Sequence, residues 1–111
     1  MTVTSPAPYD TVADVYDLVS SDYAHDRWIE AILERCAAHG LRPESVLDVA
    51  CGSGNSFLPM LDRNLAVTAC DISPEMVAVA RRRAGRRCEV HVADMRQLPA
   101  FGRFDLVTCL D

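Results

Sequence analysis

The residues best suited to do chemistry are two glycines and an acid that follow two successive apolar segments. The first segment runs into the turn 50–54, which contains Gly52 and Gly54, and the second ends in Asp71. Glycine has no Cβ, so the backbone can turn sharply there and lie close to a ligand. A carboxylate at the tip of the next strand can accept hydrogen bonds from ribose hydroxyls. The pattern predicts a pocket for a nucleoside-containing cofactor.

Two cofactors fit such a loop, and two residues help to distinguish them. A nicotinamide dinucleotide site requires a third small residue where the helix meets the sheet, whereas this chain has Phe57 there. We expect that ring to hold the helix off the sheet. Asp48 precedes the loop, and its charge suits a ligand with an ammonium and a sulfonium group better than a pyrophosphate. Both residues favour S-adenosylmethionine.

The ordered motifs resemble those of the class I S-adenosylmethionine-dependent methyltransferases. V-L-D-V-A-C-G-S-G (46–54) is similar to their first motif and V-T-A-C-D-I-S-P-E-M (67–76) to their second. V-A-D-M-R-Q-L-P (92–99) is similar to the third, and F-D-L-V-T-C-L-D (104–111) to the strand that follows. The leader Y-D-T-V-A-D-V-Y-D-L (9–18) resembles that of bacterial small-molecule and amino-sugar N-methyltransferases. The resemblance covers nearly the whole chain.

Alternating helices and strands indicate a parallel sheet with right-handed crossovers. We expect strands over residues 46–49, 66–71, 89–92 and 104–110, and helices over residues 11–20, 26–39, 55–63 and 73 to about 83. The resemblance implies an α/β fold, a doubly wound Rossmann-like sheet of order 3-2-1-4. Residues 1–40 would form an N-terminal tail and helical lid. Residues 41–111 would form the first half of the cofactor-binding domain, with the C-terminal strands missing.

The fourth expected strand would be an open edge of this incomplete sheet. An exposed apolar edge is an aggregation hazard. We therefore expect an N-terminal half of a protein, which is a fragment, a truncated gene product or a piece that needs another chain. Pairing through the open fourth-strand edge is the expected protein contact.

The resemblance also implies roles for residues around the cofactor. The loop from Ala50 through Gly52 to Gly54 would wrap the methionine end, mainly through backbone groups. Asp48 would face the ammonium group, directly or through water, or else fix the loop by accepting backbone N–H bonds. Asp71 would bind the ribose hydroxyls, or else cap the following helix.

Further roles concern adenine and the acceptor side. Ile72 would pack on the adenine face or serve as a core residue. Asp94 would accept from the adenine amino group, with the Met95 N–H bonding a ring nitrogen, or Asp94 would cap the turn 95–98. Cys109 would lie near the sulfonium. Other candidates are Tyr16, for the cofactor carboxylate or for lid packing, and Asp111, as a base or substrate contact.

Composition limits the other classes of function. The chain has 111 residues, a net charge of −5 and 50% hydrophobic residues, which allows at most one domain with a real core. The acidic balance argues against nucleic-acid binding, and no apolar run is long enough to cross a membrane. Residues 1–8 lack the pattern of a signal peptide, so we expect a cytoplasmic protein without a membrane partner.

Neither the cysteines nor the arginines suggest a second site. The five cysteines are odd in number and contain no C-x-x-C pair, which disfavours metal or disulfide sites and favours buried thiols. We expect no metal. The arginines at 81–83, 86 and 87 could form an RNA-binding patch, but a solvated helix end that complements the helix dipole is favoured.

The leading hypothesis is S-adenosylmethionine-dependent methyl transfer to a small-molecule acceptor, with an amine as one candidate. The isolated chain would supply most of the cofactor site and could lack activity by itself. The alternative is a non-catalytic cofactor-binding fragment or regulatory half. An NAD-dependent oxidoreductase is a third, less favoured hypothesis.

Overall fold

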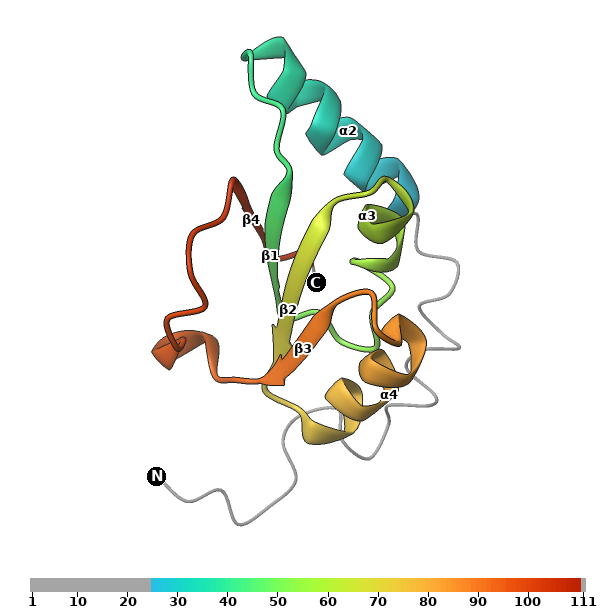
Figure 1. Ribbon diagram of the computed structural model, residues 1–111, viewed down its shortest axis with the longest axis vertical. Coiled ribbons are helices and arrows are strands. Elements are labelled where there is room, and N and C mark those ends of the chain that lie inside the picture. The colour runs from blue at the N-terminus through green and yellow to red at the C-terminus, as the bar shows by residue number, and fades with distance from the viewer. Residues whose placement is uncertain (1–24, 111) are drawn as a thin grey trace.

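The computed structural model describes residues 25–110, which form a four-stranded parallel sheet of order β3-β2-β1-β4 (Figure 1). The strands are β1 (Ser45–Val49), β2 (Ala66–Asp71), β3 (Glu89–Val92) and β4 (Leu106–Thr108). The predicted α/β class and strand order are confirmed. The expected helix 11–20, with Tyr16, and Asp111 lie outside the described residues.

The strands are parallel, so their carboxyl ends meet at one edge of the sheet. Asp48 of β1 is in register with Ala69 of β2 and with Thr108 of β4. The chain order reverses between β1 and β4, since β2 and β3 lie on one side of β1 and β4 on the other. A crevice for a ligand is expected outside the strand ends at such a reversal.

Three helices and the sheet share the larger core. The helices are α2 (His25–Ala38), α3 (Leu58–Asp62) and α4 (Pro74–Ala84), and they lie on the same side of the sheet in Figure 1. Buried residues from all three join β1 and β2 in this core, among them Ile29, Met60 and Ala80. Leu47 and Val49 of β1 and Cys70 of β2 form a second cluster, and side chains from the connection between β3 and β4 pack against it.

The ends of α4 follow directly from its sequence. Ser73 is the N-cap, where its Oγ accepts a hydrogen bond of 3.1 Å from the backbone N–H of Met76. Pro74 occupies the first turn, where its missing N–H costs nothing. Gly85 ends the helix with φ of 60°, a conformation that glycine adopts without strain. The predicted helix from Ser73 to about residue 83 therefore agrees with the structure.

Two other predicted elements were longer than those in the structure. Helix α3 begins only at Leu58, since residues 52–57 form turns. Strand β4 has three residues instead of seven. Just before it, the Asp105 carboxylate accepts hydrogen bonds from backbone N–H groups at the start of β1. Trp28 of α2 is exposed. None of the helices within residues 25–110 is long and apolar enough to span a bilayer.

Candidate functional site

The loop after β1, which we call the glycine loop (residues 50–56), has an unusual backbone. Ala50, Gly52 and Gly54 have φ values of 57°, 56° and 105°. The left-handed region is open to glycine but strained for alanine. Three such residues within one short loop reverse the chain directly at the carboxyl end of β1. The loop conformation must therefore be held by bonds from other elements.

Phe57 packs against the glycine loop from the core side. Its side chain is fully buried, in the core cluster that also contains Val46 and Met60. A Cβ placed on Gly54 would lie 2.8 Å from Cζ of this ring, so only glycine fits there. The ring thus packs against Gly54 within the core. The expectation that it would hold the helix off the sheet stays a prediction.

Asp71 connects the glycine loop to the end of β2. Its Oδ2 accepts a hydrogen bond of 2.9 Å from the N–H of Gly52, and its Oδ1 accepts one of 2.9 Å from the N–H of Ser73. The carboxylate is half-buried. The structure therefore brings Asp71 together with Gly52, as predicted from their sequence pattern. The helix cap itself is Ser73, not Asp71.

Asp48 lies deeper, with no exposed surface. Its Oδ2 accepts a hydrogen bond of 2.5 Å from Ser56 Oγ, and its Oδ1 accepts one of 2.6 Å from Thr108 Oγ1. The carboxylate thus joins β1 to the glycine loop and to β4. The loop-fixing role predicted from the sequence used backbone N–H donors, and within the described residues two hydroxyl groups donate to Asp48. A contact between Asp48 and a cofactor ammonium remains a prediction.

Asp94 follows β3 and has an arginine partner. Both of its oxygens accept from the Arg96 guanidinium, with Nη2 to Oδ2 at 2.7 Å, and Oδ1 also accepts from the Arg96 backbone N–H. These bonds lower the Asp94 pKa to about 2, the side-chain hydrogen bond being the larger cause. Asp94 also caps the short 3-10 helix η2 (Met95–Gln97), which is the alternative that the sequence left open. Its bond to adenine remains a prediction.

Two apolar side chains stand exposed beside these acids. Ile72, directly after β2, is 39% exposed, and Met95, which starts η2, is 52% exposed. Ile72 is therefore not an ordinary core residue. Apolar surface at the carboxyl ends of neighbouring parallel strands is where a flat, weakly polar ring can be buried.

Sequence reasoning missed Arg83. Its guanidinium Nη1 lies 2.8 Å from Oδ1 of Asn55, 3.2 Å from the carbonyl oxygen of Ser53 and 3.3 Å from Ser53 Oγ. The arginine run was interpreted as a solvated helix end. Arg83 continues the buried face that contains Met76 and Ala80, and this helical spacing could have identified it.

The five cysteines are free thiols in the structure. Burial raises the pKa of Cys51, and the nearby Asp48 charge raises it further. Burial also raises the Cys88 pKa to about 11. Cys109, predicted to be buried, is exposed just beyond β4. It therefore lies at the same edge of the sheet as the glycine loop.

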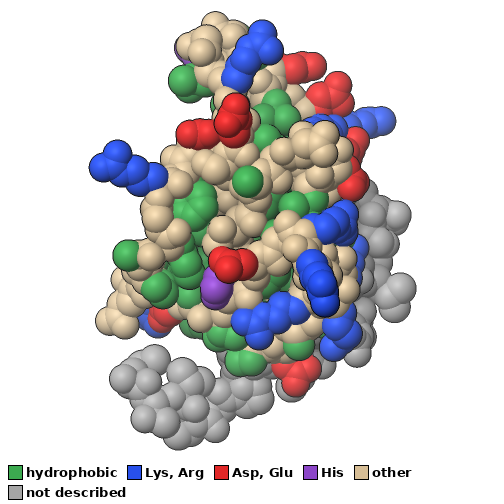
Figure 2. All heavy atoms as spheres, viewed as in Figure 1, with side chains coloured by type: hydrophobic (Ala, Val, Ile, Leu, Met, Phe, Trp, Pro, Cys, Tyr) green, Lys and Arg blue, Asp and Glu red, His purple; other side chains and the backbone are tan. Residues whose placement is uncertain are grey.

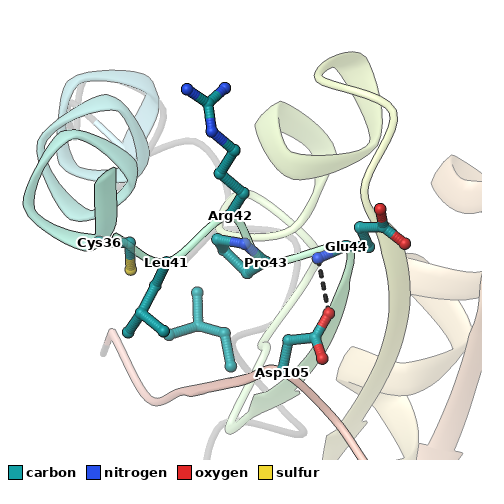
Figure 3. Close-up of a pocket in the computed structure, with 7 residues that line it drawn as sticks. Cys36, Leu41, Arg42, Pro43, Glu44 and Asp105 are labelled. Atoms are coloured by element: carbon teal, nitrogen blue, oxygen red, sulfur yellow. Dashed lines mark hydrogen bonds between the residues drawn. The ribbon is translucent and has the colours of Figure 1, made fainter. Parts of the chain in front are cut away.

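A pocket at the opposite end of the sheet is separate from this site (Figure 3). It lies where the segment after α2 meets the beginnings of β1 and β4, between Leu41, Pro43 and Leu106. Figure 3 shows the Asp105 carboxylate directed at the backbone nitrogen of Glu44, at 2.8 Å. These bonds lower the Asp105 pKa. The pocket is a junction between elements, remote from the glycine loop.

Comparison with known proteins agrees with this geometry. Residues 46–111 match the methyltransferase domain family. The chain is 35% identical over 101 residues to dTDP-3-amino-3,6-dideoxy-alpha-D-glucopyranose N,N-dimethyltransferase from Streptomyces fradiae, covering 89% of this chain and 39% of that protein. It is 41% identical over 105 residues to demethylmenaquinone methyltransferase from Beutenbergia cavernae, covering 90% and 42%. The chain thus spans about two fifths of these relatives.

A solved structure shows the same fold. The S-adenosylmethionine-bound amino pentose methyltransferase from Micromonospora echinaspora superposes with a TM-score of 0.77 at 28% identity, over 87% of this chain and 42% of that one. The family match, the sheet order and the glycine loop lead to one assignment. The chain belongs to the class I S-adenosylmethionine-dependent methyltransferases.

Proposed function

We propose that this chain binds S-adenosylmethionine at the carboxyl edge of the sheet and takes part in methyl transfer to a small-molecule acceptor. The observation that carries the proposal is the Asp71 carboxylate, bonded to the Gly52 N–H at the end of β2. It is half-exposed beside Ile72. A nucleoside needs a carboxylate that accepts hydrogen bonds from its ribose hydroxyls and, beside it, an apolar surface that covers its base.

The residues present fit this cofactor. Asp71 would accept from the ribose hydroxyls, and Ile72 would cover one adenine face. Asp94 and the Met95 N–H would address the adenine edge, and the loop from Ala50 to Gly54 would hold the methionine end. Asp48 would contribute negative charge beneath the ammonium group. When bound, the cofactor supplies an electrophilic methyl group, and the protein aligns donor and acceptor.

The acceptor class is proposed from the relatives. The Streptomyces fradiae protein is named for an amino sugar, and the Micromonospora structure for an amino pentose. We infer a small acceptor, with an amine as the first candidate. Cys109 lies at the proposed acceptor side, and Asp111, outside the described residues, is the candidate for a base or substrate contact.

Isothermal calorimetry with S-adenosylhomocysteine and NAD tests the cofactor assignment. Saturable binding of S-adenosylhomocysteine, with no binding of NAD, supports it, and the reverse preference would restore the oxidoreductase hypothesis. Turnover of labelled S-adenosylmethionine with an amino sugar then separates an enzyme from a binding-only half. Binding without turnover would favour the regulatory alternative for this chain.

The edge of β4 is proposed as the contact for further sheet structure. Within residues 25–110, β4 pairs with β1 alone, and Val107 is 60% exposed. An exposed strand edge offers unpaired backbone groups to another strand. Val107→Lys should lower self-association in sedimentation experiments, whereas Trp28→Lys, at another exposed apolar residue, on α2, should not. Equal behaviour of both variants would contradict pairing through β4.

A further inference from the structure

Arg83 is the member of the arginine run 81–83 whose guanidinium bonds the glycine loop, whereas Arg81 Nε donates to the Val90 carbonyl oxygen of β3 at 2.8 Å. Arg81 and Arg82 are exposed, whereas Arg83 is half-buried in the last turn of α4. Figure 2 shows basic side chains gathered on the surface over α4. The Arg83 guanidinium is directed elsewhere, to three oxygens of the glycine loop on Ser53 and Asn55.

Ser53 and Asn55 flank Gly54, which has φ of 105°. Left-handed backbone conformations are sparsely populated, so a loop with several of them keeps its conformation only when surrounding contacts hold it. Asp71 holds it at Gly52, and Ser56 ties its end to Asp48. Arg83 fixes the segment between these two anchors, and a hydrogen bond from a charged donor is about twice as strong as a neutral one.

We propose that Arg83 is a positioning residue for the cofactor site, which holds the glycine loop in the conformation that receives the methionine end. The proposal rests on the proposed function for the identity of the ligand. It assigns Arg83 no direct contact with the cofactor. Loss of Arg83 should therefore weaken the binding of ligands that contact the glycine loop. It should leave unchanged the binding of ligands that contact only Asp71 and the adenine surface.

The test compares S-adenosylhomocysteine with adenosine, which lacks the methionine end. Arg83→Gln should lower the affinity for S-adenosylhomocysteine about tenfold and the affinity for adenosine about twofold or less. Arg83→Lys should restore part of the loss, because it keeps a charged donor. Arg82→Gln, a change at the exposed neighbouring arginine, is the matched control and should leave both affinities unchanged. An equal loss of affinity for both ligands, or no loss for either, would overturn the proposal.

Amide hydrogen exchange of the ligand-free protein gives a second readout. Exchange at residues 52–56 should accelerate in Arg83→Gln while the strand amides stay protected, and unchanged exchange would refute the anchoring role. If the wild-type chain binds neither ligand, the proposed function fails, and exchange alone decides whether Arg83 holds the loop. If Arg83→Gln does not fold, Asn55→Ala removes the acceptor at 2.8 Å and must show the same selective pattern.

Discussion

The backbone N–H of Gly52 donates a hydrogen bond of 2.9 Å to Oδ2 of Asp71, which ties the glycine loop to the end of β2. The other oxygen accepts from Ser73, directly before α4. One acid therefore fixes the relative positions of a loop, a strand and a helix. An ionised carboxylate has about four acceptor sites, so the two backbone bonds leave capacity for ribose hydroxyls.

Replacing Asp71 with alanine should weaken S-adenosylhomocysteine binding about 10- to 150-fold, because charge-assisted hydrogen bonds are worth roughly 1.5–3 kcal/mol. Calorimetry on the folded variant measures the change. Asp62→Ala, at an exposed acid on α3, is the control and should bind normally. An unchanged affinity in folded Asp71→Ala would end the assignment of this residue to the ribose.

Replacing Ala50 with glycine should stabilise the fold by about 0.5–1 kcal/mol. The left-handed conformation costs alanine about 1–2 kcal/mol, and the greater unfolded-state entropy of glycine offsets about half of this gain. Urea unfolding gives the free energy. The same substitution at Ala78, in the exposed face of α4, should destabilise by about 1 kcal/mol. A loss of stability at both positions would show that Ala50 is not strained.

Much of the fold follows from local chemistry in the sequence. The Ser73-Pro74 pair and Gly85 predicted α4 almost to the residue, because capping depends on neighbouring atoms in the chain. The start of β4 was harder to predict, since the Asp105 carboxylate just before it bonds the start of β1, a contact between residues far apart in sequence. Such a contact exists only after folding.

The candidate site divides in the same way. The pairing of Gly52 with Asp71 was predictable, because successive parallel strands end at one edge of the sheet. The donors to Asp48 were not, since Thr108 reaches it only through the register of β4 with β1. Arg83 lies within a run of arginines, where the residue type alone does not show which one bonds the glycine loop.

Gly54→Ala should both destabilise the protein and weaken cofactor binding. The added Cβ would meet the Phe57 ring at 2.8 Å, at a residue with φ of 105°. Overpacking of a core costs about 1–3 kcal/mol in addition to the backbone strain. Gly102→Ala separates the two effects, because Gly102 has φ of 111° but nothing within 4 Å of its Cβ position. Equal losses of stability in the two variants would show that the Phe57 contact contributes nothing.

The ion pair of Asp94 with Arg96 gives a pH-dependent prediction. The Asp94 pKa lies at about 2, below its ordinary 3.8, chiefly because of the Arg96 side chain. A carboxylate with a lowered folded pKa stabilises the protein above its unfolded pKa, and this contribution is lost as the pH falls through the folded value.

Arg96→Gln should move the carboxyl titration of Asp94, followed by NMR, back towards 3.8. The stability difference between wild type and Arg96→Gln should shrink as the pH falls from about 4 to about 2. Arg103→Gln, at another exposed arginine, should leave the Asp94 titration in place. A midpoint near 3.8 in the wild-type protein would mean that the pair is not formed in solution.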